Sequence, residues 1–378
     1  MSRPAGPLRV AMVAGTLARG GAEKQFVYMV RALKADGVDV RAFVLTRGEQ
    51  HEAALCTIGV PPQWIGRHAN PLVRTGSLAA RFRTWRPDVV QAGHFYVNLH
   101  AALAAATAGA LSLGSVRSDG LRDVVRTGVF GRASLRAPRG LIANSHVARA
   151  NAARLGRRPE RVLVVPNVID IAEFDAEQGR GDRVARPADA FQVTVVARLI
   201  PPKRLERFVH ALAEARREVP AIRGRIAGEG PERGRLERLA ADLGLLPHGL
   251  QLLGEHAHVP ALLAESDVLM LTSDQEGFPN VLLEAMAARL PVISTPAGDA
   301  ARIVVDGETG FVVDGEPLLL SARLVTLARY RELAGRMGAA GRARVEREYS
   351  DRCLGASLRH AYASAGPWAP RRVRAVLA

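Results

Sequence analysis

Short apolar runs alternate along the chain with longer stretches in which apolar residues recur at helical spacing. The runs have the length of buried strands, and Gly, Pro or polar residues bound most of them. In order, the clearest are 8–14, 38–45, 89–91, 141–143, 162–165, 191–197, 268–272 and 292–295. Strands and helices that alternate in this way predict an α/β fold with doubly wound sheets.

Length and composition favour two domains. The 378 residues are 48% hydrophobic, which is enough to bury two separate cores. Residues 175–190 are polar and dominated by Gly, Arg and Asp, a composition typical of a linker. We predict a first domain over residues 1–170, a linker over 171–190, a second domain over 191–350 and a C-terminal tail over 351–378.

Residues 273–286, S-D-Q-E-G-F-P-N-V-L-L-E-A-M, are the most informative stretch. They follow the apolar run 268–272, so Glu276 is expected in the loop at a strand's carboxyl end and Glu284 in the first turns of the next helix. Ligands bind at this edge of an open parallel sheet. For two isolated Glu residues at this spacing, a helix cap and a solvated surface charge would be the simpler interpretation.

The start of that helix adds a second kind of chemistry. Pro279 suits a helix start because it has no N–H to lose. The unpaired amides of the first turn are then those of Asn280, Val281 and Leu282. Together with the positive end of the helix dipole, such amides hold hydroxyls or a phosphate. The stretch therefore suits a ligand that carries both vicinal hydroxyls and negative charge.

Two cations follow the run 191–197. Arg198 and Lys203 lie in a loop before a helix that starts at Leu205, at the same edge of the predicted sheet as Glu276. Arg grips phosphate oxygens in bidentate fashion, and Lys adds a compact point charge. Two loop cations are also common in an Arg-rich chain, so the spacing by itself leaves both interpretations open.

The first half repeats the order of strand, loop and helix. Gly20 and Gly21 open a helix after the run 8–14 and allow close backbone approach to a phosphate, but the Lys-Ser/Thr of a P-loop is missing. His94 follows the run 89–91 at another carboxyl end. A lone His is as often structural as functional, and Gly-Gly is more often a turn than a site.

The segment E-G-F-P-N-V-L-L-E-A-M-A, residues 276–287, resembles the signature of the retaining glycosyltransferases of family four without a gap. V-V-P-N-V-I-D at 164–170 and I-A-G-E-G-P at 226–231 are similar to further segments of the same family, in the same order. The resemblance extends over residues 8–349 and is strongest from residue 193 onward.

The resemblance implies the GT-B fold: two Rossmann-like domains that face each other across a cleft, with the last helix crossing back to the first domain. The first domain is then expected to bind the acceptor and the second the nucleotide-sugar. Asp299 and Arg302 depart from the family, because many members have Gly and Glu there. This departure concerns the finer geometry around the donor.

The resemblance also implies roles for single residues. Glu276 would bind sugar hydroxyls and Glu284 the ribose hydroxyls. The implied donor-binding set is Gly20, Gly21, Arg198, Lys203, Glu276, Gly277, Phe278, Asn280, Val281, Leu282 and Glu284. The implied catalytic set is Glu276, His94, Arg198 and Lys203, with His100 as a weaker substitute for His94. Arg117 and Asp119 would face the acceptor, although an ion pair within their loop is an equal alternative.

The implied activity is retaining transfer of a hexose or N-acetylhexosamine from a nucleotide-sugar to a glycan or a polyprenyl- or lipid-linked acceptor. It would serve cell-surface polysaccharide or glycolipid synthesis and need neither a metal nor a cofactor. A glycoside hydrolase also uses paired carboxylates, but it needs no diphosphate clamp. A non-catalytic nucleotide-sugar-binding protein and a basic nucleic-acid-binding protein are the remaining alternatives.

The net charge of +15 is concentrated in the first half, where residues 1–170 contain 24 Lys and Arg against 10 Asp and Glu. Such a basic surface favours anionic membrane lipid, nucleic acid or a phosphorylated acceptor. Arg residues between 121 and 139 are interleaved with Val, Phe and Leu, which predicts an amphipathic helix that docks on anionic membrane. Gly128 and Gly131 weaken a continuous helix here, and a solvated helix face is the simpler interpretation. With 5% aromatic residues and no nucleic-acid reader motif, we expect no nucleic-acid partner.

Targeting signals are not recognisable. Residues 1–7 are polar, and the apolar stretch 99–113 is mostly Ala and Gly, too short and too weakly hydrophobic to span a bilayer. Cys56 and Cys353 are too few for a disulfide framework or a zinc cluster. We therefore expect a cytoplasmic protein, with a peripheral position on the inner face of the membrane as a further expectation.

Overall fold

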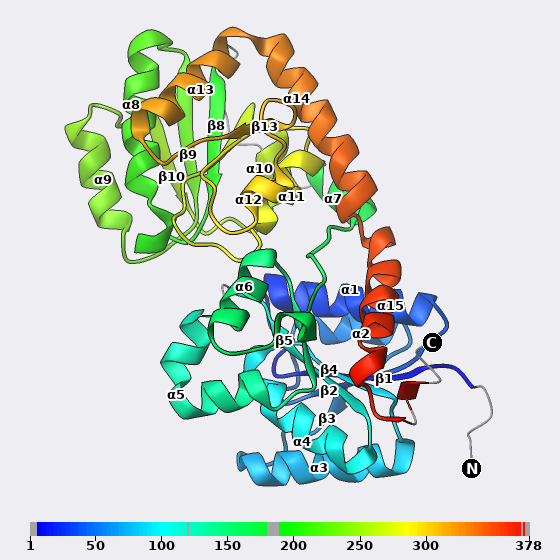
Figure 1. Ribbon diagram of the computed structural model, residues 1–378. Helices are drawn as coiled ribbons and strands as arrows, with labels where there is room; N and C mark the ends of the chain where they lie inside the picture. Colours follow the sequence, from blue (N-terminus) through cyan, green and yellow to red (C-terminus); the bar gives the residue numbers. More distant parts are fainter. Residues whose placement is uncertain (1–5, 119–120, 180–188, 372, 375–378) are drawn as a thin grey trace. The chain divides into compact units, whose positions relative to one another are not determined.

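The computed structural model of the protein describes residues 6–118, 121–179, 189–371 and 373–374. The chain folds into two compact units (Figure 1). Residues 1–168 and 351–378 form the first unit, and Ile169–Ser350 form the second. Each unit contains its own parallel sheet and its own hydrophobic cores.

The first unit is built on a seven-stranded sheet in the order β3-β2-β1-β4-β5-β6-β7, and all of its strand pairs are parallel. Its elements are β1 (Arg9–Ala14), α1 (Gly21–Ala35), β2 (Asp39–Val44), α2 (Glu52–Thr57), β3 (Gln63–Trp64), α3 (Pro71–Trp85), β4 (Val89–Ala92), α4 (Asn98–Ala108), β5 (Leu111–Val116), α5 (Leu121–Arg136), β6 (Gly140–Ala143), α6 (His146–Arg154), β7 (Val162–Val164) and α15 (Leu354–Ser364).

Helices bury both faces of this sheet, which explains why its strands are continuous apolar runs. On β1, Val10 and Met12 belong to the core that α1 and α15 cover, whereas Ala11 and Val13 belong to the core that α3 and α4 cover. Successive side chains of a strand point to opposite faces, so one short run supplies both cores. Each fully buried Val or Met side chain contributes roughly 1.5–3 kcal/mol.

The second unit has a six-stranded sheet in the order β10-β9-β8-β11-β12-β13, again with parallel pairs only. Its elements are α7 (Ile171–Gln178), β8 (Phe191–Val196), α8 (Leu205–Glu218), β9 (Ile222–Ala227), α9 (Arg233–Asp242), β10 (Leu250–Gly254), α10 (Val259–Ala264), β11 (Val268–Leu271), α11 (Asn280–Ala287), β12 (Val292–Ser294), α12 (Ala300–Ile303), β13 (Gly310–Val312), α13 (Pro317–Arg329) and α14 (Arg331–Arg344).

The same alternation builds the second unit. On β11, Val268 and Met270 lie in the core with α8 and α13, and Leu269 and Leu271 lie in the opposite core with α11. The second unit is therefore also a three-layer, doubly wound α/β structure (Figure 1). This confirms the fold class that the apolar runs predict.

The C-terminal helix α15 belongs to the first unit, which confirms the return that the family resemblance implies. Leu358 and Tyr362 pack into the core beneath α1. The Tyr362 hydroxyl donates to Gln91 Oε1 at 2.6 Å in the interior of the unit. On the surface, Arg31 of α1 donates to Asp351 at 3.0 Å. The first unit thus incorporates the last part of the chain.

Helix α7 occupies part of the stretch in which the sequence predicts a linker, and residues 180–188 of that stretch lie outside the described residues. Arg342 of α14, whose side chain is 9% exposed, donates to the two carboxylate oxygens of Asp175 at 2.6 and 2.7 Å and to the carbonyl of Ala287 at 2.8 Å. The Arg342 hydrogen bonds lower the pKa of Asp175 below its ordinary value. These bonds join α7, α11 and α14 within the second unit.

Candidate functional site

Each sheet has one point at which the strand order reverses. It lies between β1 and β4 in the first unit and between β8 and β11 in the second. Loops that leave two strands on either side of such a reversal run apart, and ligands of open α/β sheets bind at this place. Gly20 and His94 follow β1 and β4, whereas Lys203 and Glu276 follow β8 and β11. The topology therefore places the predicted residues at the two expected binding edges.

The loop after β8 is supported by the turn that follows β9. Leu199 N–H donates to the carbonyl of Glu229 at 2.9 Å. Gly228 makes this approach possible, because it has φ 145° and a Cβ there would lie 1.9 Å from the carbonyl oxygen of Ala197. The I-A-G-E-G-P segment is thus a backbone support for the loop that carries the two predicted cations.

Lys203 and Glu276 form an ion pair, although 73 positions separate them in the sequence. Lys203 ends a short 3-10 turn, η3 (Pro201–Lys203), and its Nζ lies 2.5 Å from Glu276 Oε1. Ser273 Oγ donates to the same carboxylate oxygen at 2.7 Å, and Thr272 Oγ1 donates to the carbonyl of Lys203 at 3.0 Å. The Lys203 and Glu276 side chains are 19% and 12% exposed, so solvent still reaches both charges.

Arg198 is the second predicted cation of this loop. Its side chain is exposed and forms no hydrogen bond or ion pair with any other residue in the described part of the chain. An arginine without an acidic partner keeps all its donors available for an anion. Arg198 and Lys203 thus follow β8, and Glu276 follows the neighbouring strand β11. All three lie at one edge of the sheet, as the sequence predicts.

The start of α11 offers fewer amides than the sequence suggests. Pro279 immediately precedes the first helical residue, Asn280, as expected. Leu282 N–H, however, already donates to the carbonyl of Pro279 at 3.1 Å. Glu284 is half-buried and has a partner within the protein. The Leu282 amide is therefore already paired within the protein, so a ligand at this helix end would have to displace that bond to use it.

The segment between Glu276 and α11 is packed from behind. The Phe278 side chain is 8% exposed, and its ring centroid lies 5.9 Å from that of Tyr349, so only its backbone is available to a ligand. The carbonyl of Gly277 accepts from Asp299 N–H at 3.1 Å. Gly298 has φ 60°, and a Cβ there would lie 2.6 Å from that carbonyl oxygen. Asp299, one of the two residues that depart from the family signature, thus supports this segment through its backbone N–H.

His94 is 7% exposed and both of its ring nitrogens have partners. Gly15 N–H donates to Nδ1 at 3.2 Å, so the proton of the neutral ring lies on Nε2, which faces Glu23 Oε1 at 3.1 Å. Burial by itself raises the pKa of Glu23, but hydrogen bonds from His94 and from its own backbone outweigh burial and lower it. Tyr96 stacks on the imidazole with a centroid distance of 5.4 Å. His94 is therefore held in one tautomer and one orientation.

Gly20 is the residue before α1, and the side chain of Glu23 lies close to its backbone. A Cβ on Gly20 would lie 2.1 Å from Glu23 Oε2. A carboxylate therefore lies over the glycine loop at the place where the sequence suggests a phosphate. Gly21 begins α1 next to it.

Arg117 leaves β5 and its guanidinium is enclosed by neutral groups. Nη1 donates to Asn167 Oδ1 at 3.0 Å and Nη2 to the Met29 sulfur at 3.0 Å, while Nε has no acceptor within the described residues. Burial lowers the pKa of Arg117 to about 10, which still leaves it charged at neutral pH. No carboxylate in the described part pairs with it. Asp119 lies outside the described residues, so its place at the acceptor stays a prediction.

His100 does not share the position of His94. It lies on α4, and its Nδ1 is 2.7 Å from the Thr75 hydroxyl of α3. Burial first, and the nearby Arg74 second, lower its pKa. His100 thus serves the contact between two helices.

Two family patterns match most of the chain. The family described as Glycosyltransferase Family 4 matches residues 19–173, and the family described as Glycosyl transferases group 1 matches residues 182–344. This chain belongs to the group 1 glycosyltransferases. The first match lies almost wholly in the first unit, and the second lies within the second unit.

Curated relatives of this group 1 glycosyltransferase match part of its length. It is 35% identical over 180 residues to the GDP-mannose-dependent alpha-(1-6)-phosphatidylinositol monomannoside mannosyltransferase of Mycolicibacterium smegmatis, with 45% of each chain covered. It is 32% identical over 217 residues to the D-inositol 3-phosphate glycosyltransferase of Geodermatophilus obscurus, covering 51% of this chain and 46% of that one. The match spans less than half the length of both relatives.

A solved structure matches nearly the whole glycosyltransferase. The crystal structure of HepE from Anabaena in complex with UDP superposes with a TM-score of 0.75, covering 93% of this chain and 99% of HepE at 20% sequence identity. HepE has also been solved with UDP-glucose. The likeness shows that the two Rossmann-like domains of this glycosyltransferase have the GT-B fold.

The sequence did not single out three residues of this glycosyltransferase that contact its predicted site residues. Glu23 contacts His94, Ser273 donates to Glu276, and Gly298 backs the Glu276 loop. Glu23 is the third residue of its helix, a spacing typical of helix capping, which could have drawn attention to it. Nothing local distinguishes Gly298, because its contacts are with Gly277 and Glu276, 21 and 22 positions earlier in the sequence.

Proposed function

We propose that this protein transfers a hexose or N-acetylhexosamine from a nucleotide-sugar to a glycan or lipid-linked acceptor, with retention at the anomeric carbon. Its cellular role would be cell-surface polysaccharide or glycolipid synthesis. The observation that carries the proposal is the Lys203–Glu276 ion pair at the reversal point of the second sheet. Each partner has a counterpart on a sugar diphosphate: the cation matches phosphate oxygens, and the carboxylate matches sugar hydroxyls.

The donor would bind to the second unit. Lys203 and Arg198 would contact the diphosphate, and Glu276 would turn from Lys203 to the sugar hydroxyls. Glu284 would bind the ribose hydroxyls, and the first amides of α11 would face the β-phosphate. The exposed Arg198 supports this assignment, since it has no partner in the described protein that a diphosphate would have to displace.

The chemistry follows from where charge develops. The bond between the anomeric carbon and the β-phosphate oxygen breaks, and its electron pair stays on the diphosphate. The acceptor hydroxyl oxygen forms the new bond on the same face, and its proton passes to the departing phosphate. Lys203, Arg198 and the helix amides would stabilise the growing negative charge, a contribution of about 2.7–4 kcal/mol for each such donor. In this proposal, these groups replace a metal ion at the diphosphate.

The state of His94 supports retention. An inverting enzyme needs a general base with a free acceptor that reaches the acceptor hydroxyl. Gly15 N–H occupies Nδ1 of His94, and Nε2 carries the proton that faces Glu23. In this arrangement His94 has no free nitrogen that could take a proton.

The proposal is tested by incubating the full chain with UDP-, GDP- and ADP-sugars. We expect one nucleotide-sugar to raise the melting temperature and to be consumed when an acceptor glycan or polyprenyl phosphate is added. NMR of the product should show the anomeric configuration of the donor. Nucleotide release without sugar transfer to any acceptor would point to hydrolysis, and salt-sensitive RNA binding without any effect of nucleotide-sugars would contradict the proposal.

We also propose that α5 docks the protein on anionic lipid at the cytoplasmic face of a membrane. The helix is broken at Gly128, which has φ 55° and ψ −122°. Val125, Val129 and Phe130 on either side of the break are 76%, 81% and 75% exposed, an unusual density of exposed apolar side chains. Exposed Arg side chains follow at positions 132, 136 and 139. The side chain of Arg126 lies outside the described residues.

None of the described helices has the length and apolarity that a membrane span requires. A peripheral contact would combine shallow insertion of apolar side chains with attraction to anionic headgroups. The exposed residues of α5 have both kinds of chemistry.

Changing Arg132 and Arg136 together to Ala is expected to weaken binding to vesicles of 30% anionic lipid about 10- to 30-fold, because each Arg near such a surface contributes about 1 kcal/mol. Vesicle flotation measures the bound fraction. The matched control changes Arg81 and Arg83, two exposed residues of α3, to Ala and removes the same charge. Equal flotation of all three proteins would contradict docking through α5.

A further inference from the structure

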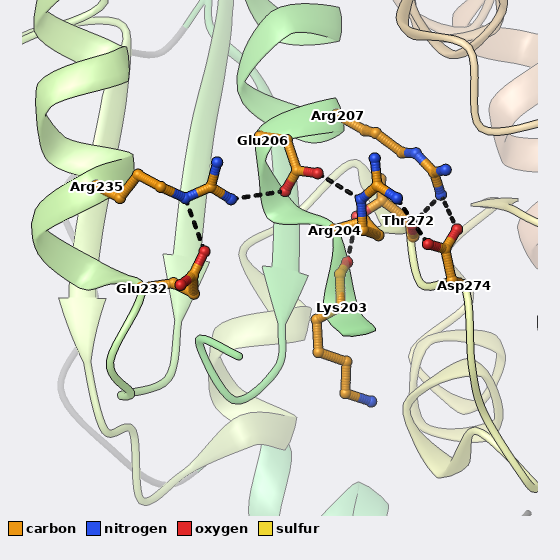
Figure 2. A network of polar contacts seen from close by, with 8 residues as sticks. All are labelled: Lys203, Arg204, Glu206, Arg207, Glu232, Arg235, Thr272 and Asp274. Carbon is orange, nitrogen blue, oxygen red and sulfur yellow. Dashed lines mark hydrogen bonds and ion pairs between the residues drawn. The ribbon is translucent and has the colours of Figure 1, made fainter. Parts of the chain in front are cut away.

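A chain of alternating charges begins next to Lys203 in the second unit (Figure 2). Asp274 joins two arginines of this chain, because its carboxylate accepts from both. Arg207 Nη1 lies 2.5 Å from Oδ1, and Arg204 Nη1 lies 2.8 Å from Oδ2. The chain continues outward from Arg204 to Glu206, from Glu206 to Arg235 at 3.2 Å, and from Arg235 to Glu232 at 2.7 Å.

Asp274 also joins the two loops through its backbone. Its N–H donates to the carbonyl of Pro202 at 2.9 Å, one residue before Lys203. Arg207 donates to the carbonyl of Thr272 at 3.2 Å from the other side. Asp274 therefore binds the loop after β8 with its amide and the start of α8 with its carboxylate. It lies two residues before Glu276 in the loop after β11.

Arg204 has a backbone conformation that needs support. Its φ is 49° and its ψ is 44°, the left-handed region that non-glycine residues rarely adopt. Such a residue costs about 1–3 kcal/mol and persists where its surroundings hold it. Arg204 directly follows Lys203, so the same turn sets the direction of the lysine side chain. The Asp274 and Glu206 carboxylates hold the Arg204 side chain.

Asp274 is not itself placed to receive the donor. Both of its oxygens accept from arginines, and its negative charge would repel a diphosphate. Burial alone raises the pKa of Asp274, but the hydrogen bonds from Arg207 and Arg204 outweigh burial and lower it. The carboxylate is therefore ionised at neutral pH and acts on the neighbouring loops.

We propose that Asp274 is a positioning residue for sugar transfer: it fixes the Lys203 turn against the Glu276 loop, so that the cation and the carboxylate meet the diphosphate and the sugar of one donor together. This inference rests on the proposed function. A positioning role and a purely electrostatic role predict opposite effects of an Asp274 substitution on activity. Removing a negative charge beside Arg204 and Arg207 should by itself tighten the binding of an anion, whereas loss of positioning slows the reaction.

The test changes Asp274 to Asn and measures kcat and the donor KM, together with the affinity for the free nucleoside diphosphate. We expect kcat to fall about 10- to 100-fold, the range that a displacement of about 1 Å produces. The donor KM and the nucleoside diphosphate affinity should stay equal or improve. Asp274→Glu, which keeps the charge and both acceptor oxygens, should recover part of the lost kcat.

Arg204→Gly provides a second variant that does not strain the backbone. Glycine adopts the left-handed conformation freely, so this change removes the ion pair with Asp274 and keeps the turn accessible. We expect it to lower kcat in the same direction as Asp274→Asn. If Asp274→Asn unfolds the protein, as thermal unfolding would show, Arg204→Gly alone decides the question.

Glu232→Gln is the matched control. Glu232 ends the same chain of charges, and its side chain contacts Arg235, not the Lys203 turn. We expect wild-type kcat for this variant. Wild-type kcat in folded Asp274→Asn and Arg204→Gly would overturn the positioning role while the transferase function stands. A wild-type protein that neither binds nor uses any nucleotide-sugar would overturn the proposed function itself.

Discussion

Changing Lys203 or Glu276 to Ala is expected to reduce glycosyl transfer at least about 100-fold. Each change removes a charged group that would contact the nucleotide-sugar, and losing one stabilising hydrogen-bonding group in such a site costs about 10²–10³ in rate. The two variants should differ in binding. Lys203→Ala should weaken the binding of the free nucleoside diphosphate, since the lysine would contact phosphate. Glu276→Ala should leave that affinity nearly unchanged, since the carboxylate would contact the sugar.

The fold should survive both changes. The Lys203 and Glu276 side chains are 19% and 12% exposed, so removing one partner leaves the other charge largely buried and costs up to about 3–5 kcal/mol, less than the roughly 5–15 kcal/mol that stabilises a folded protein. Kinetics with the donor found by screening, calorimetry with the nucleoside diphosphate and thermal unfolding provide the three measurements. Arg217→Ala is the matched control, because Arg217 is 71% exposed and pairs with Glu214 on the outside of α8. Undiminished turnover in both variants would contradict the assignment of Lys203 and Glu276 to the donor site.

Changing Gly298 to Ala is expected to lower both activity and stability, because this glycine has no room for a side chain. Its Cβ would lie 2.6 Å from the carbonyl oxygen of Gly277 and 2.7 Å from that of Glu276. Either the Glu276 loop or the strand-to-helix turn at Gly298 must then move. The left-handed φ of 60° adds about 1–3 kcal/mol of strain for alanine. A shift of the carboxylate by about 1 Å would lower kcat by up to about 100-fold.

Gly307→Ala is the control that separates the backbone strain of a left-handed alanine from the displacement of the Glu276 loop. Gly307 also has a left-handed φ, 78°, but no atom lies within 4 Å of its would-be Cβ. We expect thermal unfolding to show a lower melting temperature for both variants, and kinetics below that temperature to show a loss of kcat only for Gly298→Ala. Equal kcat in the two folded variants would mean that Gly298 does not position the Glu276 loop.

The order of strands and helices was predictable because it depends on local chemistry. Apolar runs of strand length, bounded by turn residues, mark β1 and β11 in the sequence as clearly as in the structure. The edge strand β10 was not predicted, and neither were the two short edge strands β3 and β13. Strands β3 and β13 contain two and three residues, too few for a recognisable run, and they form because the neighbouring strand presents free backbone groups.

Candidate residues of the site were predictable for the same reason. Lys203 and Glu276 each lie in the loop that follows an apolar run, and the carboxyl ends of strands in an open parallel sheet are where ligands bind. The N-cap of α6 depends on equally local chemistry: Ser145 directly precedes the helix, and its Oγ accepts from Ala148 N–H at 3.0 Å. The break of α5 at Gly128 agrees with the expected weakness of that helix.

Contacts between segments were decided by the tertiary structure alone. Lys203 and Glu276 meet because β8 and β11 are neighbours in the second sheet, and strand order does not follow from the residues of either strand. Arg204, which has a left-handed backbone conformation, donates to Asp274, 70 positions away. Likewise, the Glu23 carboxylate lies against Gly20 and faces His94, 71 positions away.

The sequence by itself therefore determined the fold class, the family and the residues that end each strand, because these depend on short-range patterns of burial, turn formation and charge. The tertiary structure decided which of those residues touch, which backbone segments support them and which side chains already have partners. The physical reason is that hydrogen bonds and ion pairs act over about 3 Å, and only packing of the whole sheet brings distant residues within that range.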